Sequence, residues 1–195
     1  MSGEEEGGRL VPFPGGGAVE GDEGLLPALE ALLFAAGAPV SARVLAAALE
    51  DVSSARVEAA LERLRRRLTA SSRALELVRV AGGWQLRTDP RFADAIVRLL
   101  GGTPQRLSQA ALETLSVVAY RQPVTRTEVE ALRGVGCGPV LRTLIDRGLV
   151  RVAGRKDEPG RPLQYATTDR FLEVFGLPDL DGLPTLRERE EIDED

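Results

Sequence analysis

The fold is decided by a stretch that begins at residues 107–125 with LSQAALETLSVVAYRQPVT and closes at residues 154–162 with the loop GRKDEPGRP. Apolar residues recur at helical spacing before the loop, and they alternate with polar residues in the short segments on either side of it. The first period is typical of amphipathic helices and the second of half-buried strands. We therefore predict three helices followed by a two-stranded wing, which together form a winged-helix unit.

The boundaries of these helices are marked by residues that start or stop a helix. Ser108 is placed to cap the first helix, and Pro123 ends it because a proline ring cannot continue the helical hydrogen bonds. Thr125 and Glu128 have the spacing of a capping box, in which each side chain accepts a hydrogen bond from the other residue's backbone N–H. The third helix is predicted to open at Pro139.

A second, looser copy of the pattern lies upstream. VRVAG at residues 78–82 recurs at residues 150–154, in both cases as a first wing strand and its turn. The matching order of elements in the two halves favours a duplication over chance. The predicted elements are helices at 22–36, after Ser41 and after Ser53 or Ser54, strands at 75–80 and 84–88, a helix at 90–100, wing strands at 149–153 and 163–167, and a helix after Thr168.

The expected fold class is mainly α with small β wings (α+β), arranged as two tandem winged-helix domains. Gly101-Gly102-Thr103-Pro104 has the composition of a linker between them. The first residues are rich in glycine and glutamate without an apolar period, which is typical of disorder, and the chain past Pro178 is expected to fray. We predict a disordered N-terminal tail at 1–21, an N-terminal winged helix at 22–101, a C-terminal winged helix at 102–177 and an acidic tail at 178–195.

The composition argues against an enzyme. The chain has no histidine, which excludes Ser-His and Cys-His nucleophile pairs and the commonest neutral metal ligand. Cys137 therefore has no base to activate it, and the glycines around it lack the Lys-Ser/Thr pair of a phosphate-binding loop. We predict no catalytic, cofactor-binding or metal-binding residues, and no cofactor.

The sequence also bears on location. No apolar run reaches the length of a membrane span, and the acidic N-terminal segment lacks the basic and apolar regions of a signal peptide. A single cysteine allows no internal disulfide and fits a reducing compartment. We expect a cytoplasmic protein without membrane contact.

The charge distribution bears on nucleic-acid binding. The net charge is −5, with acidic ends and a slightly basic middle. The third helix of a winged helix commonly enters the major groove, and in the upstream copy it carries Arg63, Arg65, Arg66 and Arg67. A phosphate-binding patch is one interpretation, but no Asn, Gln or Lys accompanies the arginines to read base edges. We favour a solvated face with Glu62 paired to Arg66, and expect direct nucleic-acid binding to be weak or absent.

The first helix of the upstream copy is more apolar than a helix with one buried face requires. Its extra apolar residues favour self-association in a symmetric dimer, and a broad core face is the alternative. The candidate dimerisation residues are Leu26, Leu29, Leu33 and Phe34.

Several motifs of the downstream copy are long and specific. They are LSQAALETL at 107–115, AYRQPVT at 119–125, RGV at 133–135, GRK at 154–156, PGRP at 159–162 and FGL at 175–177. With these motifs the chain closely resembles the bacterial segregation and condensation protein B family over about residues 107–185. Upstream the resemblance is one of layout, two winged helices in series. The chain departs from the family at Gly136-Cys137-Gly138-Pro139, where members usually carry a more polar stretch.

The resemblance implies a non-enzymatic accessory subunit of the bacterial SMC condensin. Family members form homodimers, mainly through the N-terminal winged helix. The dimer binds the kleisin ScpA (segregation and condensation protein A), which bridges the SMC ATPase heads. The implied role is chromosome condensation and segregation at the nucleoid. The alternative that two winged helices leave open is a DNA-binding transcription regulator.

Candidate residues for the kleisin interface are apolar, aromatic or wing positions. The wing loop 154–162 is stiffened by its prolines and carries mixed charge, which suits recognition of a protein surface. For Tyr120 and Pro123 the alternatives are that the tyrosine closes the core and the proline ends a helix. The candidates are Tyr120, Gln122, Pro123, Arg155 and Arg161.

Overall fold

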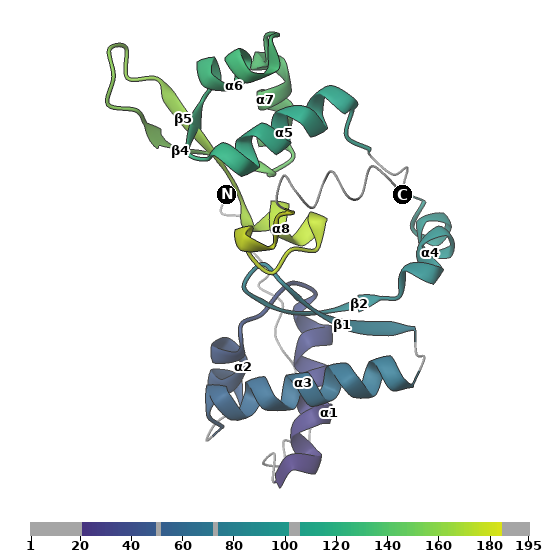
Figure 1. The fold of residues 1–195 in the computed structure, drawn as a ribbon. Coiled ribbons are helices and arrows are strands. Elements are labelled where there is room, and N and C mark those ends of the chain that lie inside the picture. The colour runs from purple at the N-terminus through teal and green to yellow at the C-terminus, as the bar shows by residue number, and fades with distance from the viewer. Residues whose placement is uncertain (1–20, 50–51, 72–73, 102–105, 185–195) are drawn as a thin grey trace, which may run out of the picture.

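The computed structural model describes residues 21–49, 52–71, 74–101 and 106–184 (Figure 1). Most of the predicted N-terminal tail and residues 185–195 of the predicted acidic tail lie outside these residues. The fold is α+β and mainly helical, as predicted. The helices are α1 (Gly21–Ala36), α2 (Ala42–Ala48), α3 (Ser54–Ala70), α4 (Ala93–Leu100), α5 (Gln109–Arg121), α6 (Arg126–Arg133), α7 (Gly138–Asp146) and α8 (Asp169–Phe175).

The strands form two small antiparallel sheets. β1 pairs with β2 in one, and the order of the other is β3-β5-β4. The strands are β1 (Leu75–Val80), β2 (Gly83–Thr88), β3 (Val124–Thr125), β4 (Val150–Arg155) and β5 (Leu163–Thr167), and short 3-10 helices lie at η1 (Pro90–Phe92) and η2 (Leu180–Gly182).

The first unit packs α1, α2 and α3 against the β1–β2 hairpin. Ser41 and Ser53 cap α2 and α3, because each side-chain oxygen accepts a backbone N–H of the first turn. Trp84 of β2 is fully buried among the leucines of the three helices. A Cβ on the neighbouring Gly83 would lie 2.8 Å from the carbonyl carbon of Val40, so the close approach of these two backbones requires glycine.

The helix predicted at 90–100 is divided in two. Asp89 caps the 3-10 turn η1, and α4 begins only at Ala93. None of the residues of α4 is buried in the described structure, and Leu99 is 84% exposed. The apolar side of α4 therefore contributes nothing to the core of the first unit.

The second unit packs α5, α6 and α7 against its three-stranded sheet. The predicted capping box is confirmed, because Thr125 and Glu128 each bond the other's backbone N–H. The two-residue strand β3 was not predicted, and it pairs with Gln164 and Tyr165 of β5. β4 runs two residues further into the wing than predicted, with a register shift between Val152 and Gly154.

The chain does not fray at Pro178, and the expectation that it does is wrong for residues 178–184. Thr168 caps α8 as predicted. Beyond the helix, Leu177 and Leu183 pack against the second core, and Asp179 caps η2 through the N–H of Gly182. Residues 178–184, the start of the predicted acidic tail, are therefore held against the second unit.

The described structure has two hydrophobic clusters, one per unit, and α8 lies between the units (Figure 1). The backbone N–H groups of Ala81 and Gly82, in the β1–β2 turn, donate to the carbonyls of Leu177 and Pro178 over 2.9 and 2.7 Å. This contact joins the first unit to the segment after α8. The domain limits at 101/102 and 177/178 stay predictions.

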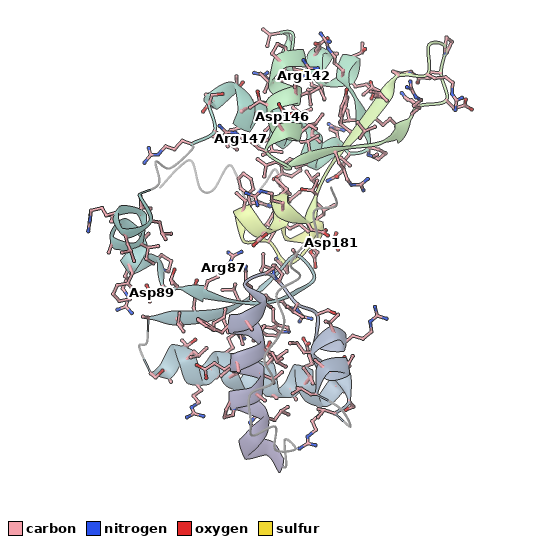
Figure 2. The ribbon with its side chains drawn as sticks, turned by 180° about the vertical axis from the view of Figure 1, so that it is seen from behind. Arg87, Asp89, Arg142, Asp146, Arg147 and Asp181 are labelled. Atoms are coloured by element: carbon pink, nitrogen blue, oxygen red, sulfur yellow. The ribbon has the colours of Figure 1, made fainter. Side chains whose placement is uncertain are left out.

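Gln85 extends the contact between the units. Its side chain is 6% exposed, and its amide nitrogen donates to Oε1 of Glu173 at 3.0 Å and to the carbonyl of Gly37 at 3.2 Å. Arg87 donates to the carbonyl of Glu173 at 2.7 Å, and Figure 2 shows it between β2 and α8. Because buried polar groups are costly unless hydrogen-bonded, this network stabilises the observed arrangement. No helix in the described part of the chain combines the length and the apolar character of a membrane span.

Candidate functional site

The wing of the second unit is anchored to the start of α6 by a carboxylate. Oε2 of Glu128 accepts hydrogen bonds from the backbone N–H of Thr125 at 2.7 Å and from its hydroxyl at 2.8 Å. Oε1 of the same carboxylate accepts from Nζ of Lys156 at 2.7 Å. Lys156 also pairs with Glu158 on the wing itself. One side chain of α6 thus caps its own helix and holds the wing loop.

These contacts shift the protonation of both partners in the directions expected for an ion pair. The hydrogen bond from Lys156, followed by the two from Thr125, lowers the pKa of Glu128 to about 2. The hydrogen bonds to Glu128 and then to Glu158 raise the pKa of Lys156 to about 12. Both groups are therefore charged at neutral pH.

The two predicted wing residues, Arg155 and Arg161, lie side by side on the exposed wing. Nη1 of Arg155 donates to the carbonyl of Arg161 at 3.0 Å, and Arg161 has a positive φ of 41°. Left-handed backbone is uncommon for a residue with a side chain and is retained where the surrounding structure fixes it. The wing therefore carries both residues in a turn that the Arg155 hydrogen bond helps to define.

Gln122 and Pro123 lie near the base of the wing. The side-chain oxygen of Gln122 accepts from the backbone N–H and the hydroxyl of Thr167 at 2.9 and 3.0 Å, and its amide donates to the carbonyl of Ala119. These bonds give Gln122 a structural role that sequence reasoning missed. Pro123 follows a cis peptide bond and is exposed.

Tyr120 lies at the edge of an apolar groove rather than in the core. Its ring is 40% exposed, and its hydroxyl donates to the carbonyl of Pro184 at 2.6 Å. The groove has a volume of about 360 Å³ between α5, α8 and the segment after α8. No local sequence pattern predicts this groove, because its walls come from segments far apart in the chain. The groove is lined by Leu112, Leu115, Ser116, Ala119, Tyr120, Phe171, Phe175, Leu177, Leu183 and Pro184.

The four predicted dimerisation residues of α1 do not share one surface. Leu26, Leu29 and Leu33 are buried in the first unit's own core, so a single folded chain does not offer them to a partner. The broad core face, the alternative to self-association, describes these three. Phe34 is 76% exposed at the C-terminal end of the helix. That α1 forms a dimer contact stays a prediction, and of the four residues only Phe34 is exposed in the single chain.

The basic face of α3 is partly neutralised by an ion pair on the same helix. Glu62 pairs with Arg65 at 3.0 Å, so the predicted pairing with Arg66 is wrong, because the carboxylate reaches the residue at i+3. One turn earlier on α3, Glu58 accepts a hydrogen bond from Nε1 of Trp84 and pairs with Arg79 of β1. That direct nucleic-acid binding is weak or absent stays a prediction.

The third helix of the second unit offers little for reading bases. Arg142 and Asp146 are exposed along α7, and Arg147 caps its end (Figure 2). An aspartate on this face would lie against phosphates of the same charge. The arrangement favours a protein partner over the DNA groove.

Cys137 lies in the turn before α7, where the chain departs from the resembled family. Its side chain is buried, and its backbone N–H donates to Oε1 of Glu130 at 2.9 Å. Burial, followed by the charge of Glu130, raises the pKa of the thiol. The protonated thiol is a poor nucleophile. Within the described ranges, no group of three His, Cys, Asp or Glu side chains could hold a metal ion.

Two winged helices in series, with a stiff wing and an apolar groove in the second, define a tandem winged-helix protein. The chain belongs to the family described as Segregation and condensation complex subunit ScpB, whose sequence model matches residues 27–186. The resemblance seen in the downstream motifs is thereby confirmed and extends through the first unit.

Individual relatives agree with this assignment. The chain is 51% identical over 166 residues to the segregation and condensation protein B of Moorella thermoacetica, a match covering 85% of each chain. It is 49% identical over 164 residues to that of Syntrophotalea carbinolica, covering 84% of this chain and 83% of the relative. The family assignment does not favour the alternative of a transcription regulator.

Solved structures of the same family are also similar in sequence. ScpB from Mycobacterium tuberculosis is 43% identical, with a TM-score of 0.39, over 80% of this chain and 98% of that one. A ScpB N-terminal domain, crystallised as a dimer complexed with a ScpA peptide, is 33% identical, with a TM-score of 0.36, over 40% of this chain and 93% of that one.

Proposed function

We propose that this chain is a non-enzymatic subunit of the SMC condensin complex, and that it acts as a homodimer that binds the kleisin ScpA in chromosome condensation and segregation. The observation that carries the proposal is the family match over residues 27–186, because it spans both winged helices. The relative crystallised as a dimer with a ScpA peptide supports both the partner and the dimer.

The surface that we assign to ScpA is the exposed side of the second unit around the wing. Arg155 and Arg161 lie close together on the wing, where they can donate charge-assisted hydrogen bonds to carboxylates of ScpA. Pro123 and the ring of Tyr120 add exposed apolar area on the same unit. Gln122 acts through the structure, because its amide bonds fix β5 against the end of α5.

The surface that we assign to the dimer includes the end of α1. Phe34 is a large apolar side chain left in solvent in the single chain, and burial of such side chains drives association. Leu26, Leu29 and Leu33 contribute by holding α1 in the first core.

The non-enzymatic role and the cytoplasmic, nucleoid-associated location also belong to this proposal. The absence of histidine from the sequence supports the first. The single cysteine supports a reducing compartment.

A calorimetric titration of ScpA into this chain tests the proposal. We expect saturable binding at micromolar concentrations, because the complex would be held together by non-covalent contacts alone. Absence of binding at those concentrations, with both proteins folded, would contradict it. The same titration with the double variant Arg155→Ala and Arg161→Ala shows whether the wing contributes to ScpA binding or whether the rest of the second unit accounts for it.

A further inference from the structure

The apolar groove of the second unit is open in the described structure. Leu112, Tyr120 and Phe175, on its two flanking helices, are 38%, 40% and 42% exposed. Such a concentration of apolar side chains around one hollow is costly to leave in water. An apolar group that covers the groove and removes this surface from water would therefore stabilise the second unit.

The lining of the groove does not favour a polar occupant. The hydroxyl of Tyr120 already donates to the carbonyl of Pro184, and the other lining side chains, Ser116 apart, are apolar. A charged or amide side chain placed there would lose its hydrogen bonds to water without replacement. The groove suits an aliphatic side chain.

The described chain ends at the groove itself. Leu183 packs against the second core, and Pro184, the last residue before 185–195, is one of the lining residues. Leu186 follows two residues later, and two residues span at most about 7 Å. Its side chain is thus the next aliphatic group along the chain, within reach of the hollow.

The family match stops at the same place. It includes Leu186 and excludes residues 187–195, which consist mostly of charged side chains. The stretch shared with the family therefore ends with the residue that can reach the groove. Charged side chains such as those beyond it would lose their hydration in an apolar site.

We propose that the groove between α5 and α8 is the docking site of this chain's own C-terminal segment, with the side chain of Leu186 as its anchor. The contact closes the second core from outside and fixes the wall formed by residues 177–184.

A double-mutant cycle in the full chain tests the contact. Leu186→Ala is expected to lower the melting temperature by on the order of 2–8 °C, and Leu112→Ala is expected to remove most of that effect, because the two side chains share the groove. Ile192→Ala is the matched control in the same segment and is expected to change nothing. Leu132→Ala, an exposed leucine of α6 away from the groove, is expected to be additive with Leu186→Ala.

An unchanged melting temperature in Leu186→Ala would overturn the proposal, and so would additivity between Leu186→Ala and Leu112→Ala. A cysteine pair distinguishes the chain's own segment from that of a second copy. Leu112→Cys with Leu186→Cys is expected to form a disulfide within one chain under oxidising glutathione. A disulfide-linked dimer, or no disulfide, would contradict the proposal.

Discussion

Nζ of Lys156, on the wing, lies 2.7 Å from Oε1 of Glu128, on the first turn of α6. The other oxygen of that carboxylate accepts both the backbone N–H and the hydroxyl of Thr125. One carboxylate therefore joins the cap of a helix to the loop that carries Arg155 and Arg161. The stability of α6 and the position of the wing depend on the same ionised group.

This relationship predicts how stability changes in acid. The pKa of Glu128 is about 2 in the folded chain and near its ordinary 4.5 when unfolded. The ionised carboxylate thus contributes stability above pH 4.5 that is lost as the pH falls toward 2. In urea unfolding between these pH values, Glu128→Gln is expected to lose less stability than the wild type. Lys156→Met is expected to lie between them, because the bonds from Thr125 remain. Identical acid dependence in all three would contradict this account.

The capping box predicts that removal of the Thr125 side chain lowers the stability of the folded chain at neutral pH. Thr125→Ala removes the oxygen that accepts the N–H of Glu128, and the loss of such a cap costs about 1 kcal/mol. The free energy of unfolding from urea titration measures it. The matched control is Thr127→Ala, an exposed threonine of the same helix, which is expected to change stability much less. An equal loss in both variants would show that the cap contributes nothing specific.

The wing predicts a change in partner binding without a change in fold. Arg155→Glu with Arg161→Glu reverses two exposed charges, and we expect the affinity for ScpA to fall about tenfold or more because charge complementarity is lost. Calorimetry gives the affinity and circular dichroism the fold. Arg142→Glu, on the exposed face of α7, is the matched control. An unchanged affinity in the double variant, or an equal loss in the control, would remove the wing from the interface.

The end of α1 predicts a change in oligomeric state. Phe34→Asp places a charge where we assign the dimer contact, and the dimer fraction is expected to fall at a given concentration. Sedimentation velocity over a concentration series measures that fraction. Leu99→Asp on α4 is the control, since Leu99 is even more exposed on the same unit. Dissociation by Leu99→Asp and not by Phe34→Asp would move the interface to α4.

The features that could be predicted from sequence are those fixed by neighbouring residues. Ser41, Ser53, Ser108, Thr125 and Thr168 all cap helices as expected, because each bonds a backbone N–H within three residues. The β1–β2 hairpin and the wing strands follow from alternation along one segment. The family resemblance rests on motifs of the same local kind.

The features that escaped prediction join distant parts of the chain. Gln85 meets Glu173 across 88 residues, and Lys156 meets Glu128 across 28. No local pattern encodes either pair. The strand β3 is two residues long and exists only because β5 returns beside it. The apolar period of α1 does not by itself distinguish a buried face from a contact surface, and three of its four predicted interface residues lie in the core of the first unit.

The central claim is that this chain is a dimeric ScpA-binding subunit, and light scattering coupled to size exclusion tests it most directly. For the chain alone we predict a mass near twice the 20.9 kDa of one chain, and with ScpA a single earlier peak that contains both proteins. A mass of one chain, with ScpA eluting separately at micromolar concentrations, would contradict the claim.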